Sequence, residues 1–409
     1  MTRSNIRLRR RAAAAAAAGL LVVSVPVGTA WSEETPSPSV SASPTASASA
    51  SEEFPQLTPA VARQLDRAVR QVMDDARVPG VTVGLWAPGK GSYVRAFGVA
   101  DKSSGAPMST GLNMRVGSVT KTFTVTALLT LVDQGKVGLD DPIGKYVKDV
   151  PNGDRITLRE LAGMRSGLFN YSMDPDFFKA LTSDPQRPFT PQELLDYSFR
   201  HPVQFQPGEK FEYSNTNAIL LGLVVEKASG RPLAEYLERN VFEPAGMNHT
   251  FLPHNAAFPA PHAQGYTDQT ASGKTENATY WNPSWAWAAG GAISDQRDLR
   301  IWARVLATGT LLSPATQAER LKTEPSNLPD TGYGLGIFDA HGWIGHNGSL
   351  PGYEALVVYL PEPKATLVVL LNTDTNYQGS EPSTLLGEAI TSVVTPQHVY
   401  SLPAQPAAK

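Results

Sequence analysis

The sequence contains no cysteine among its 409 residues. This absence excludes disulfide bonds, thiolate metal sites and a cysteine nucleophile, so the folded protein has to be held together by its apolar core. A length of 409 residues, of which 41% are hydrophobic, is enough for one large domain or for two lobes.

Positive charge is also scarce once the first 30 residues are set aside. Five of the 35 lysines and arginines lie there, which leaves 30 basic against 38 acidic residues and a formal net charge of −8. No basic run remains, and this argues against nucleic acid and anionic membranes as partners. No apolar run after residue 30 is long enough to cross a membrane, so we expect no membrane span in the mature protein.

The two chain ends have the composition of processed or unfolded segments. Five arginines precede an apolar stretch at residues 12–25, and small residues follow at 28–30, which together predict a signal peptide at 1–31 and a secreted protein in the cell-wall space. A membrane-anchoring helix is the alternative, but the apolar stretch is short and rich in alanine. Residues 32–53 are rich in Ser, Pro and Ala and predict a flexible linker, and the Pro/Ala-rich residues 397–409 predict a loose tail.

Residues 54–396 are predicted to form one folded domain, with strands near both of its ends and helices in between. The predicted strands are 81–86, 93–99, 343–345, 354–359 and 366–372, and the predicted helices are 58–75, 118–134, 157–164, 191–200, 216–229, 233–241 and 384–393. This order favours an α+β fold. It would have one antiparallel sheet built from both chain ends and flanked by helices, with an inserted, mainly helical lobe.

The first candidate for chemistry is the start of the helix predicted at 118–134. Ser118 and Lys121 are three residues apart, so their side chains share one helical face and the ammonium can reach the hydroxyl. A serine nucleophile is weak at its ordinary pKa and needs a neighbouring base, which a lysine can supply. Serine and lysine are common residues, so this pair is a weak signal when it stands alone.

Two further motifs have structural explanations when each is taken alone. Tyr213 and Asn215 stand just before a predicted helix, where they could move a proton and hold a substrate amide, or simply form a capping loop. The stretch His346-Asn347-Gly348-Ser349 follows a short predicted strand. Its histidine could relay a proton and its glycine could admit a substrate backbone, but Asn-Gly is also a strong hairpin-turn signal.

The remaining histidines do not predict a metal site. His249, His254 and His262 are scattered among proline-rich loop residues, with no cysteine and no closely spaced histidine pair. We therefore expect no metal and no cofactor.

Taken together, the three motifs resemble the active-site serine enzymes that recognise penicillin, in which S-x-x-K is followed by S-D-N and K-T-G motifs. With Tyr213-Ser214-Asn215 and His346-Asn347-Gly348 in those places, the chain is most similar to the secreted D-alanyl-D-alanine carboxypeptidases of Streptomyces and to class C β-lactamases. The resemblance runs from about residue 64 to 394 and includes the stretch 332–336, Gly-Tyr-Gly-Leu-Gly. It implies a β-lactamase/transpeptidase-like fold.

The resemblance also implies roles for individual residues. Ser118 would form an acyl-enzyme, Lys121 and Tyr213 would move its proton, and either of these two could be the base. His346 would polarise Tyr213 and the leaving group, and the N–H groups of Ser118 and Ser349 would form the oxyanion hole. The substrate-binding residues implied by the resemblance are Asn215, Asn347, Gly348, Ser349, Trp285 and Phe178.

One departure from the family pattern concerns the substrate. The carboxypeptidases have an arginine for the terminal carboxylate just after the Gly-Tyr-Gly-Leu-Gly stretch, where this chain has Phe338. Arg297 is a candidate to compensate for it. The first functional hypothesis is a penicillin-acylated D-Ala-D-Ala carboxypeptidase acting on peptidoglycan stem peptides as a monomer. The alternatives are a class C-like β-lactamase, an esterase or a D-amino-acid amidase acting on small ester, amide or β-lactam substrates, and a wall-binding protein without activity.

Overall fold

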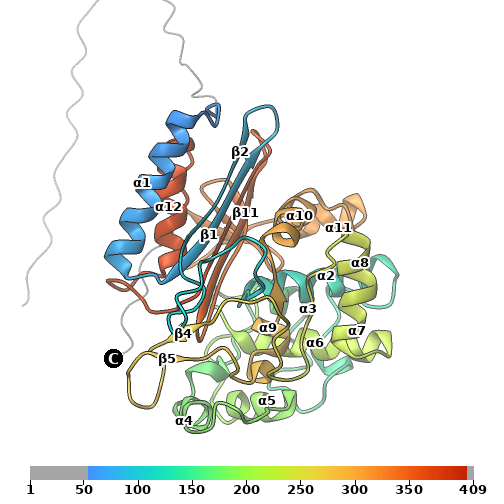
Figure 1. Ribbon diagram of the computed structural model, residues 1–409. Helices are drawn as coiled ribbons and strands as arrows, with labels where there is room; N and C mark the ends of the chain where they lie inside the picture. Colours follow the sequence, from blue (N-terminus) through green and yellow to red (C-terminus); the bar gives the residue numbers. More distant parts are fainter. Residues whose placement is uncertain (1–53, 403–409) are drawn as a thin grey trace, which may run out of the picture. The chain divides into compact units, whose positions relative to one another are not determined.

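The computed structural model of the protein describes residues 54–402 (Figure 1). The predicted signal peptide (1–31) and linker (32–53) lie outside the described residues, as do residues 403–409 of the predicted tail. None of the helices in 54–402 is long and apolar enough to pass through a membrane.

A single large antiparallel sheet organises the described part of the chain. Its eight strands follow the order β2-β1-β12-β11-β10-β9-β8-β7, so strands from the two ends of the domain meet within the sheet where β1 pairs with β12. This confirms the predicted sheet built from both chain ends. The strands are β1 (Gly80–Ala87), β2 (Gly91–Gly98), β7 (Glu324–Pro325), β8 (Thr331–Tyr333), β9 (Phe338–Ala340), β10 (Trp343–Leu350), β11 (Tyr353–Leu360) and β12 (Ala365–Leu371).

The central strands are buried on both faces, which explains their continuous apolar sequence. Every residue of β11 and β12 is buried. Side chains alternate between the two faces of a strand. Accordingly, Leu356 and Val358 of β11 pack into the core under α1 (Pro59–Ala76) and α12 (Pro382–Val394), whereas Ala355 and Val357 pack into the core of the helical lobe. Figure 1 shows α1 and α12 side by side along one face of the sheet.

The other helices form the inserted lobe that was predicted from their position in the chain. They are α2 (Val119–Asp133), α3 (Leu158–Ala162), α4 (Pro175–Ser183), α5 (Pro191–Phe199), α6 (Asn215–Ser229), α7 (Leu233–Leu237), α8 (Glu243–Ala245), α9 (Trp287–Gly290), α10 (Gln296–Thr308) and α11 (Pro314–Arg320). Two short strand pairs complete the lobe: β3 (Met114–Arg115) with β6 (Ile293–Ser294), and β4 (Tyr266–Thr267) with β5 (Glu276–Asn277).

Helix α2 is the central helix of the lobe and is buried from Val119 to Leu131. Its threonines do not leave polar groups unpaired, because Thr122, Thr126 and Thr130 donate to backbone carbonyls three or four residues earlier. The Trp302 indole also donates to the Thr122 hydroxyl at 2.7 Å. A helix that is buried on every side fixes the position of the residue at its N-terminus, Ser118.

Two segments near the C-terminus are more ordered than their sequence signals indicate. The alternative explanation of residues 346–349 as a hairpin turn does not hold, because β10 continues through them to Leu350 and the chain reverses at 351–352. The Asn-Gly signal is overridden by close packing of this strand against the segment before α2. Residues 397–402 are not loose: Tyr400 is buried in the core beside α12, and the Trp343 indole donates to the His398 carbonyl at 2.7 Å. One buried aromatic ring holds a segment whose composition suggested disorder.

Candidate active site

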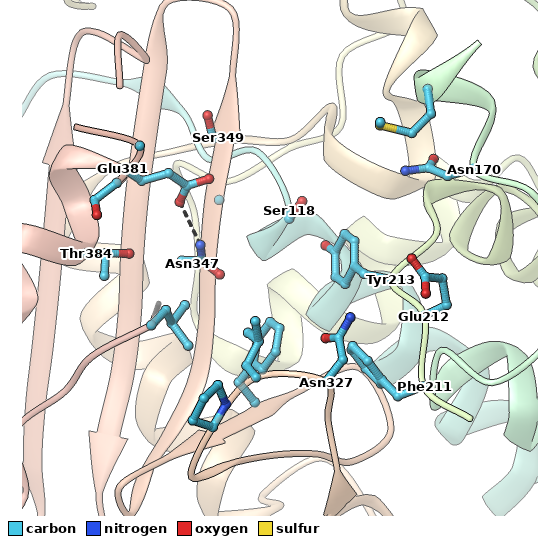
Figure 2. A pocket seen from close by; sticks show the side chains of 18 of the residues that line it. Ser118, Asn170, Phe211, Glu212, Tyr213, Asn327, Asn347, Ser349, Glu381 and Thr384 are labelled. Carbon is cyan, nitrogen blue, oxygen red and sulfur yellow. Dashed lines mark hydrogen bonds between the residues drawn. The ribbon is translucent and has the colours of Figure 1, made fainter. Parts of the chain in front are cut away.

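A cavity of about 760 Å³ opens where the start of α2, the segment before α6 and strand β10 meet (Figure 2). Beyond Gly345, β10 no longer pairs with β9, so one edge of its second half is free to border the cavity. The cavity is lined by Ser118, Phe169, Asn170, Met173, Gln204, Phe211, Glu212, Tyr213, Asn327, Leu328, Pro329, Phe338, Asn347, Gly348, Ser349, Gly379, Ser380, Glu381, Thr384 and Leu402.

Ser118 and Lys121 are placed as the helical spacing predicts. Ser118 immediately precedes α2, and the Lys121 amine lies 2.9 Å from its hydroxyl oxygen and 2.8 Å from the Ala289 carbonyl. Lys121 is completely buried, and burial lowers its pKa well below the usual 10.5. A neutral amine donates one hydrogen to Ala289 and keeps a lone pair for the proton of Ser118, which is the arrangement a general base needs.

Tyr213 forms the neighbouring wall of the cavity. The Lys121 amine lies 4.9 Å from the centroid of its ring, and its phenolic oxygen is buried without a hydrogen-bond partner among the described residues. Burial raises the pKa of Tyr213, and the adjacent Ser118 hydroxyl offsets this in part. A buried hydroxyl without a partner is unfavourable in a resting protein. Tyr213 is therefore a protonated donor placed for a group that arrives with the substrate.

The backbone of β10 packs directly against the turn that carries Ser118. A Cβ atom on Gly348 would stand 2.1 Å from the Val116 oxygen and 2.7 Å from the Ser118 nitrogen, so only glycine fits. Gly117 has a φ of +51°, and a Cβ there would stand 2.6 Å from the Ser349 nitrogen. The Ser118 and Ser349 nitrogens therefore lie on the two sides of one close contact beside the nucleophile, as an oxyanion hole requires.

His346 occupies a different place from the one expected. It is buried behind the cavity wall, and its ring centroid is 6.1 Å from that of Tyr213, with no hydrogen bond between them. Its Nδ1 lies 2.5 Å from the Asn347 carbonyl and can only donate there, so Nε2 accepts from the Tyr333 hydroxyl at 3.3 Å. Burial lowers the pKa of His346 to about 3, so the imidazole is neutral at physiological pH.

Tyr333 is thus a residue near the site that the sequence pattern did not reveal. It is buried, donates to His346 and lies edge-on to Phe338, with ring centroids 4.6 Å apart. The Gly-Tyr-Gly-Leu-Gly stretch did contain it, but the pattern gave no indication of which side chain it would contact.

Three expected substrate-binding residues do not line the cavity. Asn215 donates its amide to Ser172 at 3.0 Å, Trp285 packs against Phe177, and Phe178 points outward with 44% of its surface exposed. The adjacent Phe177 is buried in the core. These positions therefore correct the predicted set of cavity residues.

Asn170 takes the place in the wall that was expected for Asn215. Its Oδ1 accepts from the Asn215 and Ser172 backbone N–H groups and from the Ser172 hydroxyl. This leaves Nδ2 without a partner in the described part of the chain. Figure 2 shows this nitrogen on the side that faces Tyr213 and Ser118. An amide held by its oxygen presents its nitrogen as a donor for a substrate carbonyl.

The charge of the lining is entirely negative. It contains the carboxylates of Glu212 and Glu381 and no lysine, arginine or histidine side chain. Phe338, which stands in the place of the family's arginine, forms part of the wall and is nearly buried. Arg297 is exposed on α10 and does not line the cavity, so it does not compensate.

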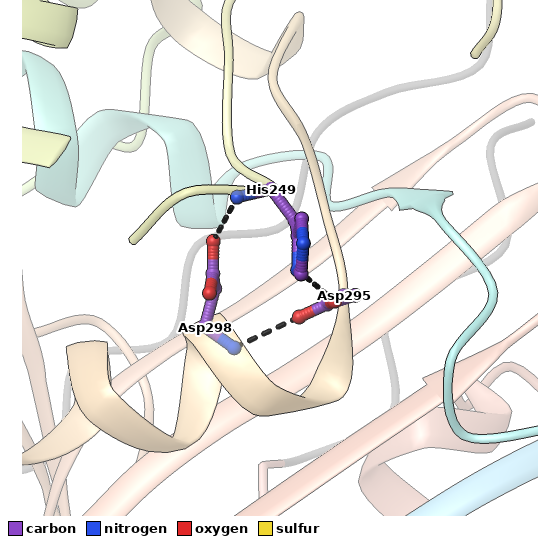
Figure 3. A group of neighbouring side chains, drawn as sticks. All are labelled: His249, Asp295 and Asp298. Atoms are coloured by element: carbon purple, nitrogen blue, oxygen red, sulfur yellow. Dashed lines mark hydrogen bonds and ion pairs between the residues drawn. The ribbon is translucent and has the colours of Figure 1, made fainter. Parts of the chain in front are cut away.

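One group of side chains has the composition of a metal site but is used structurally. His249, Asp295 and Asp298 converge at the start of α10 (Figure 3). Asp295 accepts from the Asp298 backbone N–H as the cap of α10 and lies 2.8 Å from the His249 ring, while Asp298 accepts from the His249 N–H and the Thr250 hydroxyl. None of the three lines the cavity, so the group stabilises a helix start.

Comparison with known proteins agrees with this geometry. The Beta-lactamase family model matches residues 65–387, so the chain belongs to the beta-lactamase family, whose serine enzymes recognise penicillin. The fold is accordingly the β-lactamase/transpeptidase-like one that was predicted, and the protein is a member of a family of serine hydrolases.

Individual relatives divide between two kinds of protein. Penicillin-binding protein 4* of Bacillus subtilis is 26% identical over 306 residues, which cover 70% of this chain and 67% of the relative. A D-stereospecific amidohydrolase from Streptomyces sp. has a similar structure (TM-score 0.73, 28% identity, covering 81% of this chain and 98% of the other). The D-amino acid amidase of Ochrobactrum anthropi SV3 does too (TM-score 0.72, 28% identity, covering 81% and 99%).

Proposed function

We propose that the protein is a secreted serine amidohydrolase that cleaves small D-amino-acid amides through an acyl-enzyme on Ser118. The observation that carries this proposal is the lining of the cavity, which offers no cation to a substrate carboxylate, while the buried Lys121 behind it lies 2.9 Å from the Ser118 hydroxyl oxygen. A departing amine or ammonia carries no carboxylate and needs no such cation. The likeness to structures of a D-stereospecific amidohydrolase and a D-amino acid amidase supports the same class of substrate.

The geometry supports a reaction in two steps. The Ser118 oxygen attacks the amide carbon while Lys121 accepts its proton, and the Ser118 and Ser349 N–H groups stabilise the negative oxygen that forms. Tyr213 gives its proton to the departing nitrogen and recovers one from Lys121, which lies above its ring. The C–N bond breaks and the acyl group stays on Ser118. A water molecule, deprotonated by the same groups, then releases the acid and restores the serine.

A D-alanyl-D-alanine carboxypeptidase acting on peptidoglycan stem peptides is the second candidate. The similarity to penicillin-binding protein 4* favours it, as do the three motifs around Ser118, Tyr213 and His346. The negatively charged lining weighs against it, because the product and the substrate both end in a carboxylate. The family relationship also leaves β-lactam and ester hydrolysis as side activities, which would differ from the carboxypeptidase in how fast the acyl-enzyme is hydrolysed.

A panel of substrates tests the proposal. Residues 54–409 would be assayed with D- and L-phenylalaninamide, with an N-acylated D-Ala-D-Ala peptide and with a chromogenic cephalosporin, and mass spectrometry would follow acylation by penicillin. We expect turnover of the D-amide, at most slow release of D-alanine, and a loss of at least about 10⁴-fold in Ser118→Ala. Fast D-alanine release without amide turnover would replace the proposal by the second candidate. Absence of turnover of every substrate together with absence of a Ser118 adduct would favour a protein without activity.

A further inference from the structure

Glu381 is a charged cavity residue to which the proposed reaction gives no role. It directly precedes α12, and Figure 2 shows its carboxylate beside Asn347, on the same side of the cavity as Ser349. One oxygen, Oε2, accepts a hydrogen bond of 2.7 Å from the Asn347 side chain. The other oxygen, Oε1, has no hydrogen-bond partner among residues 54–402 and is not sealed from solvent, so it is open to the cavity.

A second carboxyl group lies behind Glu381. Glu354 on β11 is completely buried, and its Oε2 accepts from the Ser383 backbone N–H at 2.7 Å. Burial and the nearby Glu381 raise the pKa of Glu354 well above its ordinary value, and burial raises that of Glu381 as well. The geometry favours negative charge on Glu381 over Glu354. Glu354 Oε1 is buried without a hydrogen-bond partner among the described residues, whereas Glu381 has the Asn347 donor and the open cavity to stabilise a charge.

Within the described residues, no ion pair involves Glu381, whereas the other carboxylate of the lining, Glu212, has the Lys210 amine at 3.9 Å. A half-buried carboxylate without a counter-ion is unfavourable, and a cation that enters the cavity removes that cost. The site is therefore complementary to a positively charged ligand group.

We propose that Glu381, held by Asn347, binds a primary ammonium group of the substrate and thereby selects cationic over neutral amides. Asn347 and Ser349 are two residues apart on β10, so their side chains share a face and lie about 7 Å apart along the strand. An ammonium group bound at Glu381 is therefore separated from the amide bond that Ser118 attacks by about the length of one or two substrate residues. The α-amine of the acyl part meets this requirement, as does an amine on the departing part. The choice of an amide as the ligand rests on the proposed function.

Binding without turnover tests the proposal separately from catalysis. In a Ser118→Ala background, D-phenylalaninamide and its N-acetyl derivative would be titrated by calorimetry at neutral pH. We expect the ammonium compound to bind about tenfold more tightly or better, and Glu381→Gln to abolish this preference, because a hydrogen bond to a charged group is lost. Glu388→Gln, which removes an exposed carboxylate from the same helix, should keep the preference.

Several outcomes would overturn the inference. Equal or undetectable binding within the first pair and also within the second pair described next would do so, as would a preference that survives Glu381→Gln or that disappears only in Glu212→Gln. A second pair, N-acetyl-D-phenylalanine joined to ethylenediamine or to propylamine, moves the ammonium to the departing side. A Glu381-dependent preference in either pair supports the proposal and locates the ammonium. If the wild-type protein shows the preference but hydrolyses no amide, the proposed function fails while the ammonium site stands.

Discussion

The two walls of the cavity are built in different ways. On one side, Ser118 and Lys121 come from a single turn at the start of a buried helix, and Tyr213 is held just before α6. On the other side, Asn347 and Glu381 come from a strand and from a helix start that are 34 residues apart and meet through one hydrogen bond. Ser118 and Lys121 are fixed relative to each other by local spacing, whereas Tyr213 and the groups of the recognising wall, Asn347 and Glu381, depend on tertiary contacts.

The two walls differ in electrostatics as well. Burial favours neutral Lys121 and neutral His346, so the reacting side stores no charge before the substrate arrives. The recognising side has a carboxylate without a counter-ion at Glu381. The charge available to select a substrate therefore lies on the wall opposite Ser118 and Lys121, so a substitution can change the charge of one wall without changing the residues of the other.

On the reacting wall, removing the base should have a larger effect than any substitution on the recognising wall. Lys121→Met keeps the length of the side chain but cannot accept the Ser118 proton, so kcat/KM for the D-amide should fall about 10³-fold or more. The melting temperature should change little, because a buried amine is exchanged for an apolar group of similar volume. Activity near that of the wild type would show that Tyr213 alone acts as the base.

The pH profile of the wild-type enzyme checks the same assignment. Protonated Lys121 cannot accept a proton, so kcat/KM should rise with pH and level off at a pH well below 10.5, the ordinary pKa of lysine. If the same rise of kcat/KM with pH persists in Lys121→Met, the group that titrates is not Lys121.

Overpacking the close contact between β10 and the turn that carries Ser118 should have the next largest effect. In Gly348→Ala, the new methyl group meets the Val116 oxygen and the Ser118 nitrogen, so β10 must move away from the nucleophile. The displaced oxyanion donors should lower kcat about 10²–10³-fold, and overpacking should lower the free energy of unfolding by about 1–3 kcal/mol. Gly111→Ala is the matched control, since nothing lies within 4 Å of its added Cβ. Equal effects of the two substitutions would contradict the close contact.

The same substitution at Asn170, which lines the cavity, and at Asn215, which does not, compares the two positions. Asn170→Asp keeps the oxygen that accepts from Asn215 and Ser172 but removes the free donor, so kcat/KM should fall about tenfold. Asn215→Asp adds the same charge next to Ser172, outside the lining, and should cost less than about threefold. The reverse order would mean that Asn215 turns toward the substrate, as the family resemblance implied.

Much of the fold could be predicted because its strong signals are local. Helix α1 was expected at 58–75, and the structure has the Thr58 hydroxyl as N-cap with Pro59 in the first turn, which is a typical sequence signal for a helix start. The buried α2 and the strands β11 and β12 followed from continuous apolar runs. The extension of β10 through Gly348 could not be predicted, because it depends on a backbone contact with Val116 more than 200 residues earlier.

The same distinction explains which cavity residues were found. Ser118 and Lys121 could be placed together from helical spacing alone, and the order of the motifs added Tyr213. Glu381 was missed because nothing in its sequence surroundings refers to Asn347, and Asn170 was missed because only the tertiary fold brings it to the segment before α6.

The buried histidine predicts a smaller effect, on stability. The pKa of His346 is about 3 in the folded protein, below its value of 6.5 in the unfolded chain. The contribution of neutral His346 to folding stability is therefore complete above pH 6.5 and is lost as the pH falls from there toward 3. Wild type should lose about 2 kcal/mol relative to His346→Gln between pH 7 and pH 5 in urea unfolding. Asp374 has a pKa of about 7 and acts in the opposite sense, so the difference between the two proteins is the quantity to measure. Parallel pH profiles would show that His346 is not buried in neutral form.

The smallest effect is expected at Phe178, the residue named from the sequence as a wall of the site. Its ring is 44% exposed and is absent from the lining, so Phe178→Ala should change kcat/KM by less than about twofold. The neighbouring Phe177 packs edge-on against Tyr171 and Tyr197, and Phe177→Ala should lower the free energy of unfolding by about 3–5 kcal/mol. Kinetic assays of Phe178→Ala and denaturation of Phe177→Ala test whether the recognising wall includes α4.

A KM that rises strongly in Phe178→Ala would show that this wall extends beyond Met173. Unchanged kinetics would show that the substrate is selected by the residues around Asn170 and Glu381.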